Sequence, residues 1–322
     1  GTHRVRDDHV RHEFAGGGDV LAPVLVDVHE EMRGRQRCEP GEIVGAQSSL
    51  YVLRNRVDVT HDTLVIARHA AWPWPEELDD DLRAKRSRAL NDARAYRWCD
   101  DPREWCEVLG DLTPPAWEEF ARLPNSPTGY ILRGAKADKS RWSRMYAASA
   151  QQARDLAAEL RYDTGLGLGG GPVPIVARPY VPLEPVGEMV GGVPMAMEFR
   201  LFVLLGDIVA HTFYWPLDDE EEHERLTREF VVPHVAREAI ERIEEFGRVP
   251  FYALDIARAA DGRWIVVEVN DGQRAGLQGI PPSRFYGEMR RCLVGPQGVM
   301  RVAPGDGGGI VRTDGMLTGG RR

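Results

Sequence analysis

The chain has 322 residues, which at about 100–200 residues per domain allows two or three compact domains. Hydrophobic residues make up 43% of it, which supports packed cores and excludes a disordered chain. The net charge of −9 argues against nucleic acid as the main partner, since phosphate binding needs a basic surface.

The sequence predicts a cytoplasmic protein that does not enter a membrane. No apolar run approaches the roughly 18 residues of a membrane helix, and the charged first residues do not resemble a signal peptide. The four cysteines, Cys38, Cys99, Cys106 and Cys292, show no Cys-x-x-Cys zinc spacing, and disulfide frameworks are typical of short secreted chains. We therefore expect free thiols in a reducing compartment.

In chain order, the first third predicts an α/β arrangement. Strands are expected within residues 19–32, 49–59 and 62–70, and one helix over residues 76–96. Residues 98–124 combine short helical turns and loops, with prolines stopping each turn.

The middle of the chain predicts an α+β arrangement. A strand that enters a loop is expected over residues 129–142, an alanine-rich helix over 143–162 and a strand over 173–183. The glycines at 163–172 follow a helix and precede a strand, which is the reverse of a dinucleotide-binding loop. We interpret them as a flexible connection.

Two predicted hairpins dominate the rest of the chain. The first covers residues 197–215, with Gly206-Asp207 at its turn, and the second covers residues 252–273. An acidic segment at 218–230 and an amphipathic helix at 233–247 separate them. Hairpins argue against a purely parallel sheet.

The second hairpin carries three polar residues in otherwise apolar strands. A two-residue turn at Asp261-Gly262 places Asp255 directly opposite Glu268, whereas a longer turn would shift the pairing by one residue. Alternation then places Trp264, Val266, Glu268 and Asn270 on one face. Ile265, Val267 and Val269 share the other face, which the pattern assigns to the core.

Two opposed carboxylates need a compensating charge. At about 5 Å they repel by about 3 kcal/mol at an effective dielectric of about 20. A shared proton or a divalent cation would offset this, and Asn270 adds an oxygen ligand of the kind Mg²⁺ accepts. The residues alone leave open a second interpretation, in which the polar residues merely end the hairpin.

Lysine is rare in this chain, and two lysines lie close together. Only Lys85, Lys136 and Lys139 are lysines among the 41 basic residues. Arg133, Lys136, Lys139 and Arg141 follow a predicted strand at Tyr130, and such a group suits a polyphosphate. A solvated basic loop is the alternative.

These stretches together resemble a known superfamily. The segments "YILRGAKADKSRW", "IVARPYVPL", "MEFRLFVLLGDIVAHTFYW" and "FYALDIARAADGRWIVVEVNDGQRAGL" are similar to the ATP-grasp superfamily. The likeness is greatest to the clade named for an arginine and two lysines, found in phage and bacterial proteins. It implies an N-terminal pre-ATP-grasp α/β domain followed by two α+β subdomains that clasp ATP.

The resemblance assigns roles to residues of this sequence. It implies that Asp255, Glu268 and Asn270 hold Mg²⁺. Arg133 stands where many members carry a phosphate-binding lysine. Lys136 and Lys139 would lie near the β- and γ-phosphates of ATP.

The resemblance also implies an adenine contact and a catalytic arginine. The hinge strand at Arg178, Tyr180 and Val181 would meet adenine through its backbone, although Pro179 has no N–H to donate. Arg200 matches the arginine that faces the γ-phosphate or a developing acyl phosphate, so the implied catalytic set is Arg200, Lys136 and Lys139.

The domain boundaries follow from these assignments. We expect an N-terminal domain at residues 1–95, a central lid subdomain at 96–183, a C-terminal subdomain with the metal site at 184–295 and a Gly-rich tail at 296–322.

The resemblance implies an ATP- and Mg²⁺-dependent carboxylate–amine ligase that acts on small carboxylates and on amines or short peptides. A kinase of the same fold and a nucleotide-binding sensor without turnover are the alternatives. A homo-oligomer is left open.

Overall fold

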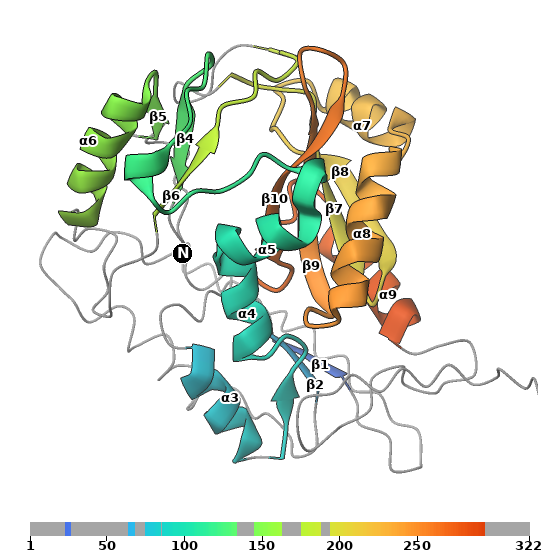
Figure 1. Cartoon of the computed structure of the whole chain (residues 1–322). Helices are drawn as coiled ribbons and strands as arrows, with labels where there is room; N and C mark the ends of the chain where they lie inside the picture. Colours follow the sequence, from blue (N-terminus) through green and yellow to red (C-terminus); the bar gives the residue numbers. More distant parts are fainter. Residues whose placement is uncertain are drawn as a thin grey trace, which may run out of the picture.

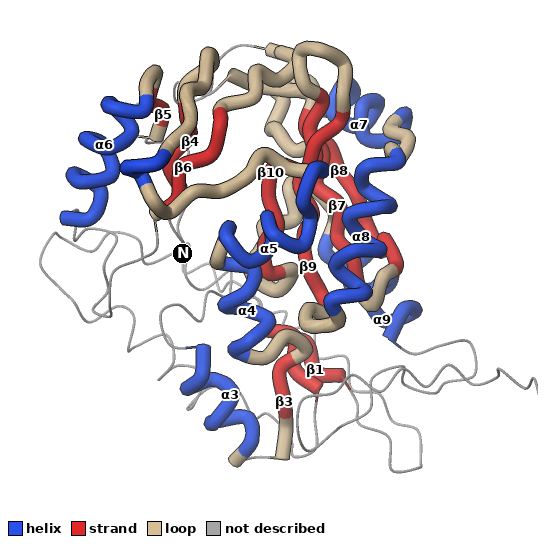
Figure 2. The backbone as a smooth tube through the Cα atoms, in the orientation of Figure 1, coloured by secondary structure: helices blue, strands red, loops and turns tan. Residues whose placement is uncertain are grey.

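The computed structural model describes residues 23–26, 64–67, 75–84, 86–133, 145–162, 175–187 and 194–293. Within these ranges, three sheets and the helices that cover them form a mixed α/β and α+β architecture (Figures 1 and 2). None of the described helices is both long and apolar enough to cross a membrane. The expected strand at 49–59, the Gly-rich connection at 163–172 and the tail at 296–322 lie outside the described residues.

A four-stranded antiparallel sheet in the order β10-β9-β7-β8 forms the centre of the described structure. Its strands are β7 (Glu198–Leu204), β8 (Asp207–Phe213), β9 (Phe251–Arg258) and β10 (Trp264–Asp271). The two expected hairpins are therefore confirmed. β10 is an edge strand, so its outer backbone groups need partners from outside the sheet.

Both faces of this sheet are packed. On one face, Leu201, Leu254 and Val269 contact a layer of helices built from α4 (Ala93–Asp100), α5 (Pro102–Leu109) and α8 (His234–Phe246). On the other face, Phe202 and Phe251 pack on Phe285 of α9 (Pro282–Leu293). Helix α9 was not expected from the sequence pattern. Figure 1 shows α8 and α9 on opposite sides of the sheet.

The acidic segment forms a surface helix. It is α7 (Glu220–Glu229), none of whose side chains is buried, and Asp219 caps its first turn by accepting from the backbone N–H of Glu221 and Glu222. Three glutamates lie in that first turn, where the helix dipole favours negative charge. The run of acidic residues therefore stabilises the first turn of a solvent-exposed helix.

A smaller sheet lies beside the central one. β4 (Tyr130–Arg133) pairs antiparallel with both β5 (Tyr146–Ala147) and β6 (Val176–Pro179). Helix α6 (Ala150–Tyr162) covers it, and the expected helix at 143–162 begins only at Ala150 because the preceding residues pair with β4 instead. The short helices η1 (Gly110–Leu112) and η2 (Phe120–Arg122) lie in the segment that leads to β4.

The N-terminal sheet is parallel, in agreement with the expected α/β start. It contains β1 (Pro23–Val26), β2 (Leu64–Ala67) and β3 (Arg88–Ala89). The single helix expected at 76–96 is wrong. Helix α3 (Pro75–Arg83) ends, β3 follows, and Asp92 then starts α4 by accepting a hydrogen bond from Ala95 N–H at 2.8 Å.

Two smaller expectations are also wrong. Pro102 begins α5 at its first helical position, where a missing N–H costs nothing, rather than stopping a turn. The first hairpin turns at Leu205-Gly206, not at Gly206-Asp207, and both residues have positive φ, of 53° and 81°. Such a turn matches the twist of its strands.

Asn91 joins the N-terminal segment to the central sheet. Its Nδ2 donates to the carbonyl of Phe251 at 2.5 Å, and Phe251 N–H donates to Asn91 Oδ1 at 3.1 Å. Nδ2 also lies 3.0 Å from Oδ1 of the buried Asp271, at the end of β10. The side-chain amide thus pairs with β9 as a strand backbone would.

Asp79 gives a test of this packing. Burial raises its pKa to about 6, against the opposing effect of the hydrogen bond from Ala93 N–H at 2.7 Å. The folded state therefore binds a proton more tightly than the unfolded state does, and this group lowers stability as pH rises from about 4 to about 6. We expect Asp79→Asn, which keeps an acceptor for Ala93, to raise the free energy of unfolding at pH 7.5 more than at pH 4.5.

Denaturant unfolding at the two pH values measures this difference. Asp80→Asn, on the exposed side of the same helix, serves as the control and should not stabilise preferentially at pH 7.5. An Asp79→Asn effect that is equal at both pH values would contradict the assignment.

Candidate active site

The second hairpin pairs Asp255 with Glu268 as predicted, but by another route. Its turn has three residues, because Ala259 N–H donates to Arg263 O at 2.7 Å and Gly262 takes a positive φ of 86°. The longer turn shifts the pairing by one residue, so that Val266 lies opposite Ile256. A β-bulge at Val267 then shifts it back, and Glu268 lies opposite Asp255.

Because of the bulge, the predicted faces of β10 are wrong. Trp264 and Val266 pack in the same hydrophobic cluster as Val269, beside α8 and α5, and not on the face of Glu268. Because Val267 adds one residue to the strand, the alternation reverses after it. Glu268 and Asn270 therefore face the other side, which they share with Asp255.

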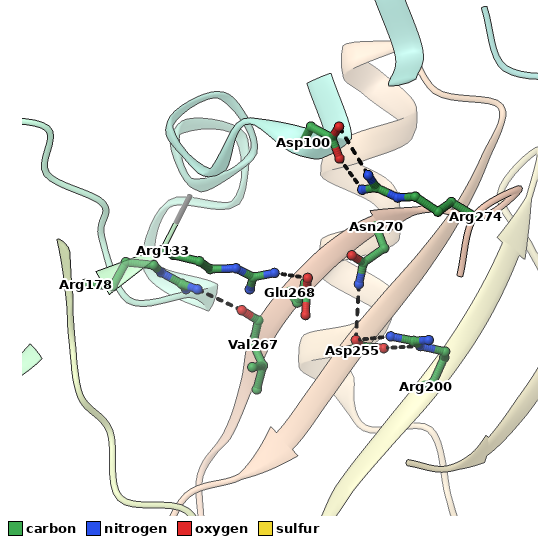
Figure 3. A network of polar contacts seen from close by, with 9 residues as sticks. All are labelled: Asp100, Arg133, Arg178, Arg200, Asp255, Val267, Glu268, Asn270 and Arg274. Atoms are coloured by element: carbon green, nitrogen blue, oxygen red, sulfur yellow. Dashed lines mark hydrogen bonds and ion pairs between the residues drawn. The ribbon is translucent and has the colours of Figure 1, made fainter. Parts of the chain in front are cut away.

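The pairing produces a row of polar side chains across the sheet. Glu268, Asp255, Arg200 and Thr212 are successive partners on β10, β9, β7 and β8. Arg200 binds Asp255 through two hydrogen bonds, from Nε at 2.8 Å and from Nη2 at 2.7 Å. Asn270 Nδ2 lies 3.3 Å from Asp255 Oδ2, and Figure 3 shows Glu268, Asn270, Asp255 and Arg200 close together.

Arg200 is almost fully buried at 5% exposure. Burial alone would lower its pKa, but the contact with Asp255 raises the pKa above the ordinary value for arginine. Its guanidinium also lies 5.0 Å from the ring centre of Tyr214, and Nη1 donates to Gly276 O at 3.2 Å. The predicted catalytic arginine is thus fixed at the centre of the row.

Arg133 comes to the same site from the smaller sheet. It lies at the end of β4 and forms an ion pair with Glu268 (Figure 3). Burial, reinforced by the nearby charge of Arg178, lowers the pKa of Arg133 to about 10. Its buried Nε has no hydrogen-bond partner within the described residues, so part of this guanidinium is left for another acceptor.

The segment predicted as the hinge strand runs from β6 of the smaller sheet to the turn of the second hairpin, where Pro182 O accepts from Ala260 N–H at 2.9 Å. Tyr180 N–H donates to Gly129 O at 2.9 Å, and Tyr180 O accepts from Thr128 Oγ1 at 2.5 Å. Both backbone groups of Tyr180 are therefore used. Val181 N–H makes no hydrogen bond to any described residue.

The Arg178 side chain turns away from the hinge toward β10. It is 6% exposed, and its Nη1 donates to Val267 O at 2.8 Å, its Nη2 to Thr113 Oγ1 at 2.6 Å and its Nε to Pro114 O at 3.2 Å. The guanidinium also lies 4.8 Å from the ring centre of Trp105. Any adenine contact of Arg178 is thus left to its backbone.

The donor set on this face suits a hard divalent cation. Asp255, Glu268 and Asn270 offer two carboxylates and an amide oxygen, the oxygen ligands that Mg²⁺ prefers. Within the described part of the chain, no group of three or more His, Cys, Asp or Glu side chains is placed to hold a metal ion, and the candidate set here consists of two carboxylates and an asparagine. Each carboxylate is paired with an arginine, so a cation would compete with Arg133 and Arg200.

Of the ten predicted site residues, six meet in the structure, Tyr180 and Val181 follow directly after β6, and two lie outside the described residues. Asp255, Glu268, Asn270, Arg200, Arg133 and Arg178 meet around β10 (Figure 3). Lys136 and Lys139 lie outside the described residues.

The sequence reasoning missed Thr113, Asp100 and Arg274. Arg274, in the loop after β10, forms a buried ion pair with Asp100 of α4. Burial raises the pKa of Asp100, and Arg274 opposes that rise. No spacing pattern joins residues so far apart in the sequence, so only the fold could reveal the pair.

The comparison with protein families identifies this region. Residues 131–289, which run from β4 into α9, match the ATP-grasp domain of family 3 in the clade named for one arginine and two lysines. These residues form an ATP-grasp domain of that clade.

Several solved structures resemble the chain at low sequence identity. D-cycloserine synthetase DcsG shares 16% identity, over 74% of this chain and 86% of its own, with a TM-score of 0.45. The D-alanine–D-alanine ligase of Coxiella burnetii shares 12%, over 70% and 67%, with a TM-score of 0.42. Macrocyclase MdnC of Microcystis aeruginosa, solved with precursor peptide MdnA, shares 13%, over 68% and 67%, with a TM-score of 0.39. Curated proteins give no match.

Glu268→Gln tests the candidate metal site. The change keeps the shape of the side chain and removes its charge, so we expect a folded protein whose affinity for Mn²⁺, used as a paramagnetic substitute for Mg²⁺, falls at least about tenfold. Electron paramagnetic resonance of free Mn²⁺ measures the affinity, and circular dichroism checks the fold.

Asp261→Asn, at the exposed turn of the same hairpin, is the matched control and should bind Mn²⁺ like the wild type. Equal Mn²⁺ affinity in Glu268→Gln and the wild type would remove Glu268 from the ligand set.

Proposed function

We propose that the protein is an ATP- and Mg²⁺-dependent carboxylate–amine ligase. A substrate carboxylate attacks the γ-phosphate of ATP, which forms an acyl phosphate and releases ADP. An amine then displaces phosphate and leaves an amide or peptide bond. Neither step needs a covalent bond to the protein, so positioning and electrostatics supply the catalysis.

The polar row on the central sheet is the observation that carries this proposal. Asp255 and Glu268 lie opposite each other beside Asn270, and arginines reach them from two directions. Carboxylate and amide oxygens next to guanidinium groups are the surroundings that a metal-bound polyphosphate requires. Mg²⁺, when bound by these oxygens, would neutralise charge on the phosphates.

The arginines and lysines take separate roles in this proposal. Arg133 lies close enough to Glu268 to pair with it, and a triphosphate offers the same guanidinium another acceptor. Lys136 and Lys139 contribute compact charges to the distal phosphates. Arg200, held by Asp255, faces the γ-phosphate and the developing acyl phosphate.

The hinge strand would receive the base. Pro179 lacks an N–H, and the backbone groups of Tyr180 are engaged with Gly129 and Thr128. The N–H of Val181 is therefore the donor that we assign to adenine.

The products of the reaction test the chemistry. Because the cationic groups are assigned to the β- and γ-phosphates, we expect ADP and phosphate to form in step with amide. A screen of amino acids and small peptides with ATP and Mg²⁺, analysed by chromatography of nucleotides, measures this. Hydroxylamine should trap the activated acid as a hydroxamate.

Other outcomes would contradict the ligase. ADP with a phosphorylated product and no hydroxamate would indicate a kinase. Release of AMP and pyrophosphate would refute attack on the γ-phosphate. Nucleotide binding without any product across the screen would favour a sensor.

Nucleotide affinities test the two lysines. We expect Lys136→Ala and Lys139→Ala each to weaken ATP binding by about tenfold or more, since a charge-assisted hydrogen bond is worth about 1.5–3 kcal/mol. AMP, which lacks the distal phosphates, should lose much less affinity. Isothermal titration calorimetry measures both ligands.

Lys85→Ala removes the third lysine and is the control, with no expected effect on either nucleotide. An equal loss for ATP and AMP in the Lys136 and Lys139 variants would mean that these side chains do not contact the distal phosphates.

A further inference from the structure

The direction of Glu268 depends on one extra residue. Up to Val266, the even-numbered side chains of β10 pack into the core beside α8. An uninterrupted strand would send Glu268 to that same face, into a hydrophobic cluster. The bulge at Val267 turns Glu268 to the face of Asp255, so the candidate metal site exists only if the bulge is kept.

A bulge on an edge strand leaves backbone carbonyls that the sheet cannot satisfy. Here two side chains from outside the sheet donate hydrogen bonds to these carbonyls. Thr113 Oγ1 donates to Val266 O at 2.7 Å, and Arg178 Nη1 donates to Val267 O at 2.8 Å. Arg178 Nη2 donates in turn to Thr113 Oγ1 at 2.6 Å. One hydroxyl thus links the arginine to the first carbonyl of the bulge.

Arg178 is an unusual residue to bury at this place. It forms no ion pair with a carboxylate of the described residues, and burial lowers its pKa. Its charge is met by the carbonyls of Val267 and Pro114 and by the ring of Trp105. A planar fork with several N–H donors can reach these acceptors together, whereas a lysine ammonium cannot.

We propose that Arg178 and Thr113 are positioning residues that hold the Val267 bulge and thereby turn Glu268 into the metal site. They contact neither metal nor nucleotide in this role. The proposal rests on the proposed function, because it takes Glu268 as a metal ligand. It makes the metal site of β10 dependent on a side chain of β6, which belongs to the other sheet.

Thr113→Val tests the proposal, since valine keeps the shape of threonine and removes the hydroxyl that serves both hydrogen bonds. Substitution of residues that orient metal ligands typically lowers metal affinity by about 10- to 100-fold, so we expect the Mn²⁺ affinity of Thr113→Val to fall about tenfold. Thr113→Ser should restore it. Arg178→Lys, which keeps the charge and loses the fork, should weaken Mn²⁺ binding as well.

Thermal unfolding of each variant separates positioning from simple loss of stability. Arg242→Lys is the matched control, because Arg242 of α8 also donates to a backbone carbonyl, that of Leu109, but away from the bulge. It should change the melting temperature without changing Mn²⁺ affinity. Thr113→Val in a Glu268→Gln background should cost no further Mn²⁺ affinity, since the effect is transmitted through Glu268.

The outcomes distinguish this inference from the proposed function. Unchanged Mn²⁺ affinity in folded Thr113→Val and Arg178→Lys would overturn the positioning role alone. A further loss in the double variant as large as in the single one would also overturn it. A wild-type protein that binds no Mn²⁺, with or without ATP, would overturn both proposals.

Discussion

The bulge at Val267 is the constraint on which the rest of the site depends. A strand has only two faces, so a polar residue reaches the correct face only by the parity of its position. In β10 the apolar residues Trp264 and Val266 before the bulge and the polar residues Glu268 and Asn270 after it share the same sequence parity, and the extra residue Val267 turns the two pairs to opposite faces. The same strand can therefore serve the core at one end and carry the ligands at the other.

Charge compensation is the second constraint. Asp255 is fully buried and Glu268 half-buried, and each meets an arginine, as does Asp100 in the loop contact behind them. Removing one member of such a pair leaves a buried charge without a partner, which costs more than the pair contributes. A bound cation or phosphate would therefore rearrange partners rather than add charge to an empty place.

The sequence allowed much of this site to be predicted, for reasons that differ between residues. Asp255 and Glu268 were paired correctly because two errors cancelled. The turn is one residue longer than expected, which shifts the pairing of β10 with β9 by one residue, and the bulge at Val267 shifts the pairing back. Local patterns report pairing only through turn chemistry, and a bulge has no reliable local pattern. The faces of Trp264 and Val266 were therefore predicted wrongly.

Other features depend on contacts between distant segments. The helix expected at 76–96 is interrupted, and Asp92 caps the start of a new helix, α4. The helix-like composition of the segment gave no sign of this break. The use of the Arg178 side chain and the pair of Arg274 with Asp100 depend on how the segments meet in three dimensions. Patterns of hydrophobicity predict elements, whereas such partners follow only from packing.

Asn91 has a consequence for the order in which the protein can be made. Its amide binds Phe251, 160 residues later, and Asp271, 180 residues later. During synthesis Asn91 leaves the ribosome long before either partner exists, and its hydrogen bonds are made to water until then. Contacts of such long sequence separation slow folding, because the entropy of loop closure is lost before they form. A chain truncated before Phe251 contains Asn91 but lacks both Phe251 and Asp271, the partners of its side-chain amide.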